Sequence, residues 1–419
     1  MLSSKQEGIL LTTGLNRDRR RILPITEIEH SAFCKTEDEL PSKPLVEEFN
    51  VNIRWQQIPV EYLHLTADEL DIRIGEARAK LGDEVIILGH HYQREEVIKY
   101  ADLQGDSYLL SKYAASHSQS KYIVFCGVHF MAETARTLCS DSQQVILPNI
   151  TAGCSMADMA PTEDVLDAWD DLKQILDEDE SIVPITYMNS TAEIKALCGR
   201  NNGIVCTSSN AAAVMRWAFE RGRRILFMPD QHLGRNTGIA LGIGLDEMIV
   251  WNPFKPLGGH TPEEIRNSKI ILWQGHCSVH TRFTVRQINS ARERHPGINV
   301  IVHPECTMET VQAADINGST ETIIKSINES APGSKWAVGT EISLVNRLAK
   351  NNPDKTIFCL DPVVCPCSTM YRIHPAYLSW VLDRLVEGEV VNEIKVSSET
   401  KKYANIALQR MLEVTSASN

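Results

Sequence analysis

The chain lacks several features that mark membrane proteins and secreted proteins. Among its 419 residues, no apolar run approaches the ~18 residues that a membrane-spanning helix requires. Residues 1–11 lack the basic stretch followed by a long apolar segment that is typical of a signal peptide. Basic residues are not in excess, and the net charge of −12 argues against a nucleic-acid surface. We therefore expect a cytoplasmic protein that binds neither membranes nor nucleic acids.

The cysteines also lack two common patterns. There are 11 of them, an odd number, and they are not spaced as densely as in a small disulfide-stabilised domain. The compact C-x₂-C pairs of structural zinc sites are missing. Cys126, Cys206 and Cys359 lie within apolar runs, so we expect them to be buried like small hydrophobic residues. Reduced thiols fit a cytoplasmic setting.

What is present is the pattern of an α/β protein. From residue 84 onward, short apolar runs alternate with helical patterns, which is typical of βαβ units with parallel sheets. The length suits roughly three domains. We predict three αβα units, related by a pseudo-threefold axis, with short parallel sheets around a central cluster site. The predicted ranges are 1–64 for an N-terminal extension and 65–154, 155–277 and 278–365 for the three units.

Composition and local pattern predict the character of the remaining segments. The extension, 1–64, is polar and broken by prolines, which favours a solvated or loosely docked arm. A helix is predicted over 66–80, with Thr66 as its N-cap. The stretch 236–264, rich in glycine and proline, is interpreted as an insertion in the second unit. The C-terminal helices, 366–419, are expected to pack on the first unit.

The three units share one order of polar residues. In each, a strand ends in a polar pair, a hydroxyl follows after a turn, and a strand-end cysteine comes last. In chain order these residues are His90, Tyr92, Ser107 and Cys154; Tyr187, Asn189, Ser208 and Cys277; and His303, Glu305, Thr320 and Cys365. Because ligands bind at the carboxyl ends of parallel strands, we expect all three sets to face one cavity.

Three converging thiolates predict an iron–sulfur cluster with one ligand missing. A [4Fe–4S] cluster usually takes four cysteines, so a three-cysteine site leaves one iron open as a Lewis acid. Zinc would also accept three cysteines and one further ligand. Spacing alone barely favours Cys365 over Cys367 as the third sulfur, because the two stand in the sequence Cys365-Pro366-Cys367.

The polar residues suit acid–base chemistry and anion binding. His90, Tyr92 and His303 are candidate acids, bases or carboxylate ligands, and Glu305 is a candidate proton acceptor. Tyr187 and Asn189 could orient a carbonyl group. Ser107, Ser208 and Thr320 lie at expected helix starts, where backbone N–H groups bind phosphate or carboxylate. Each has an ordinary alternative, since such hydroxyls are often N-caps and strand-end histidines are often structural.

These motifs closely resemble the quinolinate synthase family, in one order from about residue 84 to 375. The matching stretches are 89–93, 105–107, 127–135, 187–196, 206–210, 277–280, 302–305 and 318–320. One departure stands beside the first histidine, where the family's common His-Asn-Tyr-Gln is His90-His91-Tyr92-Gln93 here.

The resemblance implies a [4Fe–4S] enzyme of de novo NAD biosynthesis. It would condense iminoaspartate with dihydroxyacetone phosphate to give quinolinate, phosphate and water, with L-aspartate oxidase as the supplier of iminoaspartate. The family's cluster ligands fall on Cys154, Cys277 and Cys365, the last because Cys365-Pro366 precedes a nearby methionine, Met370. Its substrate-binding and catalytic positions fall on His90, Tyr92, Ser107, Tyr187, Asn189, Ser208, His303, Glu305 and Thr320, with catalysis expected at Glu305, Tyr92 and His303.

Two other functions stay open at this point. A hydro-lyase could use the open iron of a similar [4Fe–4S] cluster on a different hydroxy acid. An iron–sulfur sensor or scaffold would be no enzyme at all, but it would not need three recurring polar pairs around the cluster. An assay for quinolinate under anaerobic conditions distinguishes these functions.

Overall fold

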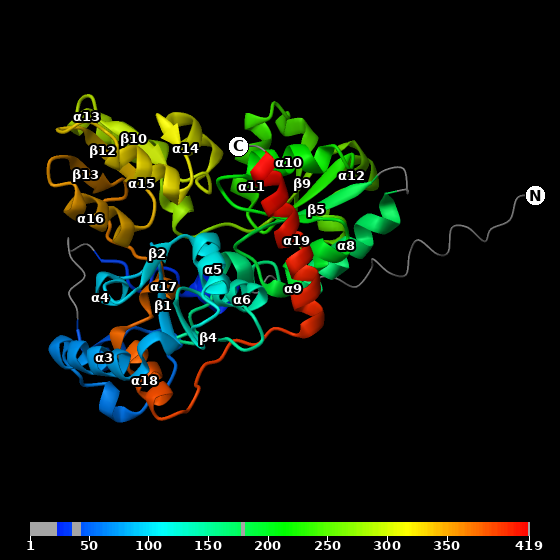
Figure 1. Ribbon diagram of the computed structural model, residues 1–419. Helices are drawn as coiled ribbons and strands as arrows, with labels where there is room; N and C mark the ends of the chain where they lie inside the picture. The colour runs from blue at the N-terminus through cyan, green and yellow to red at the C-terminus, as the bar shows by residue number, and fades with distance from the viewer. Residues whose placement is uncertain (1–22, 36–42, 177–180, 418–419) are drawn as a thin grey trace, which may run out of the picture.

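The computed structural model describes residues 23–35, 43–176 and 181–417. Within them the chain forms three separate sheets in which every named strand pair is parallel, and helices cover each sheet (Figure 1). The predicted α/β fold of repeated αβα units with short parallel sheets is confirmed. No helix in this part of the chain is long and apolar enough to cross a membrane.

The first unit is a four-stranded sheet with helices between its strands. Its elements are α3 (Ala67–Leu81), β1 (Val85–His90), α4 (Glu95–Ile98), β2 (Leu103–Gly105), α5 (Ser107–Ser116), β3 (Tyr122–Cys126), α6 (His129–Leu138) and β4 (Gln144–Ile146). The strand order is β2-β1-β3-β4. The predicted helix is α3, and Thr66 caps it through a reciprocal capping box with Glu69. Ile74 lies in the core, whereas Ile72, two residues earlier, is 62% exposed on the opposite face.

The second unit has five strands. Its elements are α7 (Ser155–Asp158), α8 (Thr162–Ile175), β5 (Ile182–Tyr187), α9 (Ala192–Arg200), β6 (Ile204–Cys206), α10 (Ala211–Phe219), β7 (Arg224–Met228), α11 (Gln231–Ala240), β8 (Met248–Trp251), α12 (Pro262–Asn267) and β9 (Ile270–Trp273). The strand order is β6-β5-β7-β9-β8. The stretch interpreted as an insertion contains β8, which pairs with β9 and extends the sheet by one edge strand.

The third unit repeats the four-stranded arrangement. Its elements are α13 (Val285–Arg294), β10 (Asn299–Val302), α14 (Met308–Ala313), β11 (Ile316–Asn317), α15 (Thr320–Asn328), β12 (Lys335–Gly339), α16 (Ile342–Asn351) and β13 (Thr356–Cys359). The order β11-β10-β12-β13 matches that of the first sheet and, without β8, that of the second. Equivalent strands of the three sheets therefore carry the polar pairs, the hydroxyls and the cysteines.

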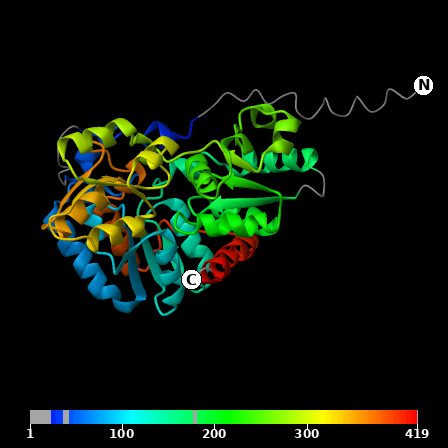
Figure 2. The same cartoon turned by 90° about the horizontal axis from the view of Figure 1, so that it is seen from above.

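The C-terminal helices pack on two different units. α17 (Ser368–Tyr371) precedes α18 (Pro375–Val386), which lies against α3 of the first unit. The last helix, α19 (Ser398–Ala417), runs mainly along α9 and β6 of the second unit (Figures 1 and 2). Gly199 permits this close approach, because a Cβ there would overlap the Tyr403 carbonyl of α19. The expectation that both helices pack on the first unit is thus wrong for α19.

The described part of the N-terminal extension is firmly docked, contrary to the loose arm expected from its polarity. It includes α1 (Ile25–Ile28) and α2 (Leu45–Glu48). Leu45 and Tyr62 are buried, and Glu48 forms a buried ion pair with Arg94 of the first unit at 2.8 Å. Residues 1–22, with their arginine-rich stretch, lie outside the described residues.

Candidate active site

The three units face one cavity at the carboxyl ends of their strands. It encloses about 920 Å³, counting the part open to solvent. Of the residues predicted from the sequence, those that line it are His90, Tyr92, Ser107, Cys154, Tyr187, Asn189, Ser208, Cys277, His303, Glu305 and Thr320. The structure therefore brings together residues from all three units, although more than 200 positions separate the first from the last in the sequence.

The third sulfur at the cavity is Cys367. It lines the cavity with Cys154 and Cys277, and these sulfurs lie close enough to influence one another's ionisation. Cys365 is not among the described residues that line the cavity, because its sulfur forms a disulfide with Cys34 of the N-terminal extension. The expectation that Cys365 is the third ligand stays a prediction, and Cys367 is the third cysteine that lines the cavity.

The three cavity cysteines form a donor set that suits a cationic metal centre. Burial raises the pKa of the thiol in Cys154, Cys277 and Cys367, so in the protein alone the neutral thiol is favoured. A bound metal centre reverses this preference, because its positive charge stabilises the thiolate that ligates it. Three soft sulfur donors from separate segments fit an iron–sulfur cluster or zinc.

The cavity hydroxyls at two helix starts are not N-caps. Asp106 caps α5 by accepting hydrogen bonds from backbone N–H groups, and Ser319 does the same for α15. Ser107 and Thr320 are the next residues, and both line the cavity. Ser208 lines it from the loop before α10. The hydroxyls and two helix N-termini thus face the same space, where the helix dipoles favour an anion.

Two histidines at strand ends are held in the same way. The backbone N–H of Tyr92 donates to Nδ1 of His90 at 3.1 Å, and that of Glu305 donates to Nδ1 of His303 at 3.3 Å. Burial lowers the pKa of His90, and it lowers that of His303 to about 3. In the neutral rings the proton therefore sits on Nε2, which makes each histidine a hydrogen-bond donor at that nitrogen.

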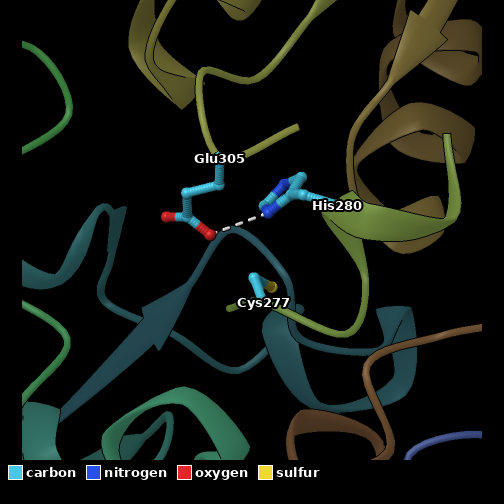
Figure 3. A group of neighbouring side chains, drawn as sticks. All are labelled: Cys277, His280 and Glu305. Atoms are coloured by element: carbon cyan, nitrogen blue, oxygen red, sulfur yellow. Dashed lines mark hydrogen bonds and ion pairs between the residues drawn. The ribbon is translucent and has the colours of Figure 1, made fainter. Parts of the chain in front are cut away.

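Glu305 lies at the centre of a buried cluster that sequence reasoning only partly found. His280 Nδ1 lies 2.9 Å from Glu305 Oε2 (Figure 3). The His280 ring also stacks on the His303 ring, with centroids 4.3 Å apart. Burial by itself would raise the pKa of Glu305, but His303, His280 and a hydrogen bond from Tyr187 hold it below the usual range. Glu305 is thus a carboxylate at neutral pH.

Cys277, His280 and Glu305 also form a possible metal-binding group. One potential ligand atom from each lies within 4.8 Å of the others. His280 stands in a short turn three residues after Cys277, rather than at the end of a strand. The strand-end pattern therefore gave no signal for it, although the family resemblance includes the stretch 277–280.

Tyr92, in the first unit, forms hydrogen bonds with residues of the third unit. Its hydroxyl lies 3.0 Å from Thr320 Oγ1 and 2.9 Å from Thr340 Oγ1. Burial raises the pKa of Tyr92, so the phenol is protonated. Its neighbour His91, which departs from the family's pattern, lies 2.9 Å from Glu321 of α15 and adds a second link between the two units.

In the second unit the polar pair is held by a buried lysine. Lys195 is fully buried on α9 and donates from Nζ to the backbone carbonyls of Met188, at 2.8 Å, and Ser190. These carbonyls flank Asn189, so the lysine fixes the loop that presents it. Burial lowers the pKa of Lys195 to about 7. Tyr187, at the end of β5, hydrogen-bonds Glu305 across the cavity.

Comparison with known proteins identifies a family model that matches most of this chain. The model of the quinolinate synthetase A protein family matches residues 73–413. The chain belongs to this family. It is 58% identical to the quinolinate synthase of Corynebacterium glutamicum over 364 residues, which cover 87% of this chain and 92% of the relative.

Two further relatives show the same breadth of similarity. The quinolinate synthase of Herpetosiphon aurantiacus is 58% identical, over 84% of this chain and 95% of the relative. That of Bacillus anthracis is 49% identical, over 85% of this chain and 96% of the relative. Family members at this identity and coverage are enzymes, and so is this chain. The matched range contains all the cavity residues from His90 to Cys367, so the site described above belongs to the part shared with the family.

Proposed function

We propose that the chain is a quinolinate synthase that condenses iminoaspartate with dihydroxyacetone phosphate. The products are quinolinate, phosphate and water, and the reaction serves de novo NAD biosynthesis. The observation that carries the proposal is the single cavity that combines three sulfurs, hydroxyls at helix starts, and a buried carboxylate beside two histidines. Membership of the family supports it.

The proposed cofactor is a [4Fe–4S] cluster held by Cys154, Cys277 and Cys367. When bound, the cluster would offer one iron without a cysteine ligand as a Lewis acid for a substrate oxygen. Cys365 gives way to Cys367 in this ligand set because its sulfur bonds to Cys34. The cysteines of this set are partly buried and pack against the main hydrophobic core.

Substrate anions are held by neutral donors and helix N-termini. Ser107, Ser208 and Thr320 supply hydroxyls for the phosphate or carboxylate groups, and the helix dipoles of α5 and α15 add favourable charge. His90 donates from Nε2, which suits a carboxylate oxygen. Tyr187 and Asn189 position the carbon skeleton. Neutral donors in a buried site bind anions without competition from water.

Proton transfer falls to Glu305, Tyr92 and His303. Glu305 is ionised and buried, so it accepts a proton from a substrate carbon or hydroxyl during isomerisation and condensation. His303 donates from Nε2, and Tyr92 donates from its hydroxyl, when a leaving oxygen needs a proton. We place the enzyme in the cytoplasm, with L-aspartate oxidase as the supplier of iminoaspartate.

Anaerobic purification followed by product analysis tests this function. The purified protein is given dihydroxyacetone phosphate and freshly generated iminoaspartate, and quinolinate and phosphate are quantified. Both products are expected in equal amounts. Formation of a dehydrated product from a hydroxy acid alone would identify a hydro-lyase instead. No turnover by a protein with a full complement of iron and sulfide would contradict the enzymatic assignment.

A further inference from the structure

One segment of the N-terminal extension, residues 24–35, contacts the chain beside each of the three cavity cysteines. Its first contact lies on the segment that carries Cys154. Thr26 Oγ1 donates to Asp158 Oδ2 at 2.6 Å, and Asp158 ends the short helix α7, whose N-cap is Cys154. A Cβ added at Gly153 would lie 3.1 Å from Thr26 Cγ2. The extension therefore packs directly against the backbone that presents this cysteine.

The second contact lies beside the cysteine of the second unit. Glu27 of α1 is 9% exposed, and its Oε1 lies 3.2 Å from Nε2 of His276. His276 is the residue directly before Cys277. Hydrogen bonding at this distance restrains both side chains. The backbone that presents Cys277 is thereby tied to the same short helix of the extension.

The third contact lies just before Cys367 and combines a backbone hydrogen bond with a covalent bond. The backbone N–H of Lys35 donates to the carbonyl of Val364 at 2.8 Å. The adjacent residues, Cys34 and Cys365, form the disulfide. The extension is therefore joined to the short stretch that carries both neighbouring cysteines.

Two more contacts join the extension to α17, whose N-cap is the third cavity cysteine. The Phe33 ring lies against the Tyr371 ring with centroids 4.9 Å apart, and Phe33 is buried. Glu29 pairs with Arg372, directly after α17, at 2.9 Å. Arg372 is 1% exposed and also donates to the carbonyl of Thr151 at 3.3 Å. This arginine thus connects the extension to the chain before the first cavity cysteine as well.

From these contacts we propose that residues 24–35 form a clamp that fixes the three cysteine segments relative to one another. The residues of the clamp are positioning residues, because they act through the cysteines and not on the substrate. A metal centre needs its ligands placed within about 0.5 Å, and contacts behind the ligands provide that placement. The clamp lies outside residues 73–413, the range that the family model matches. The inference rests on the proposed function, since the proposed cluster is what makes the relative placement of the cysteines matter.

Substitutions can remove the contacts of the clamp one at a time or together. Thr26→Val removes the hydroxyl and keeps the shape, Glu27→Ala removes the carboxylate, and Cys34→Ser removes the disulfide. A combined variant carries all three changes, whereas Thr26→Ser and Glu27→Gln keep the polar groups. Tyr62→Phe is the matched control, because it removes a buried hydrogen bond of the same extension, to Asp383 of α18 at 2.9 Å.

Alkylation of the cluster-free protein measures the clamp without cofactor or activity. Labelling of Cys154 and Cys277 by iodoacetamide, without reductant, is followed by peptide mass spectrometry. We expect roughly tenfold faster labelling in the combined variant and roughly threefold in each single variant, because lost contacts lower the local stability that protects the thiols. The conservative variants and Tyr62→Phe should stay within about twofold of the wild type.

Two results of the alkylation experiment would overturn the clamp. One is an unchanged labelling rate in the combined variant, and the other is equal acceleration in Tyr62→Phe, which would show general loosening of the extension. If the combined variant does not fold, the three single variants decide by the same comparison with the control.

Release of the cluster to a chelator is the second measurement. Proteins reconstituted with iron and sulfide are mixed anaerobically with excess EDTA, and the loss of visible absorbance is followed. The combined variant should release the cluster roughly 10–100-fold faster than the wild type, and Tyr62→Phe at the wild-type rate. Equal release from all variants would contradict the clamp alone. A wild type that assembles no cluster would contradict the proposed cofactor, and the alkylation rates would still decide the clamp.

Discussion

The first and third units differ from the second in how they present equivalent strand ends. In the outer two, a histidine at a strand end is locked by a backbone N–H two residues later, and Tyr92 and Glu305 are connected through buried side chains. In the second unit the strand ends in Tyr187, and Lys195 holds the following loop. Under the proposed function, the same topology supplies proton-transfer groups in two units and neutral orienting groups in one.

This comparison shows that the repeated topology determines where each strand end lies, but not which chemistry its residues can perform. All three strand ends face the cavity because the three sheets share a strand order. What each end can do depends on its neighbours, since a buried carboxylate stays ionised only where donors surround it. Four sets of substitutions follow, from the largest expected effect to the smallest: the first three test how far this division holds, and the fourth tests stability away from the site.

The sharpest contrast is between Cys367 and Cys365, two positions apart on one extended segment. Cys367→Ser should abolish cluster absorbance and all turnover, because it removes a sulfur that lines the cavity. Cys365→Ser removes only the disulfide to Cys34 and should retain both the cluster and activity. Absorbance spectra and iron content of the anaerobic proteins provide the measurement. Loss of the cluster in Cys365→Ser alone would restore the original sequence prediction.

Glu305→Gln tests the proton-transfer role of the third unit. The change keeps size and shape but removes the basic oxygen, so turnover should fall roughly 1000-fold while the cluster remains. Quinolinate formation at saturating substrate provides the measurement. Glu309→Gln, an exposed carboxamide substitution one turn later, is the matched control and should leave the rate unchanged. A Glu305→Gln enzyme with full turnover would remove Glu305 from the mechanism.

Lys195→Met tests the loop of the second unit. The lysine satisfies two buried carbonyls around Asn189, so its loss should cost about 1–3 kcal/mol of stability and raise KM roughly tenfold. Denaturant unfolding measures the loss of stability, and steady-state kinetics measure the change in KM. Lys173→Met, at an exposed position of α8, controls for the loss of a charge. An unchanged KM would show that the loop keeps its shape without the lysine.

His374 contributes a pH dependence that is separate from the site. It is buried at the start of α18, where Nδ1 accepts from the backbone N–H of Ala376 and Nε2 donates to the Lys43 carbonyl. Burial lowers its pKa from 6.5 to about 4. The folded state thus favours the neutral ring, and its contribution to stability is present above pH 6.5 and is lost as the pH falls toward 4.

The consequence is measurable by substitution. Between pH 7.5 and 5 the wild type should lose about 2 kcal/mol of unfolding free energy through His374 alone. His374→Asn keeps a good N-cap but has no titrating ring. Over the same pH range, the unfolding free energy of this variant should therefore fall by about 2 kcal/mol less than that of the wild type. Urea unfolding of both proteins at the two pH values tests this. Parallel pH profiles would exclude His374 as the cause.

Local sequence patterns barely distinguish the two neighbouring cysteines, Cys365 and Cys367. In an extended segment, residues i and i+2 are nearly equivalent by spacing, so spacing barely favours Cys365 over Cys367, and the family resemblance implies Cys365. Only the docking of Cys34 against Cys365 separated them. The extension could not be placed from its sequence, because the few apolar residues that anchor it, such as Leu45, lie between polar stretches and prolines.

The strand ends, by contrast, can be predicted from the amino-acid sequence. Apolar runs that end in polar residues predict parallel strands, and ligand-binding groups follow at their carboxyl ends. His90, Tyr92 and Glu305 were found in this way. His280 and Thr340 were not, because His280 lies in a short turn and Thr340, although it directly follows β12, is outside the repeated set of polar pair, hydroxyl and cysteine. Their importance arises only from contacts with residues that are distant in sequence.

The amino-acid sequence by itself determined the three α/β units, the strand ends that carry the polar groups and two of the three sulfurs that line the cavity, since these follow from local periodicity. Tertiary structure alone decided which third cysteine lines the cavity, the docking of α19 on the second unit and the buried connection from Tyr92 to Glu305. The physical reason is that local patterns fix which face of an element is buried, whereas contacts between units depend on how those faces meet in space.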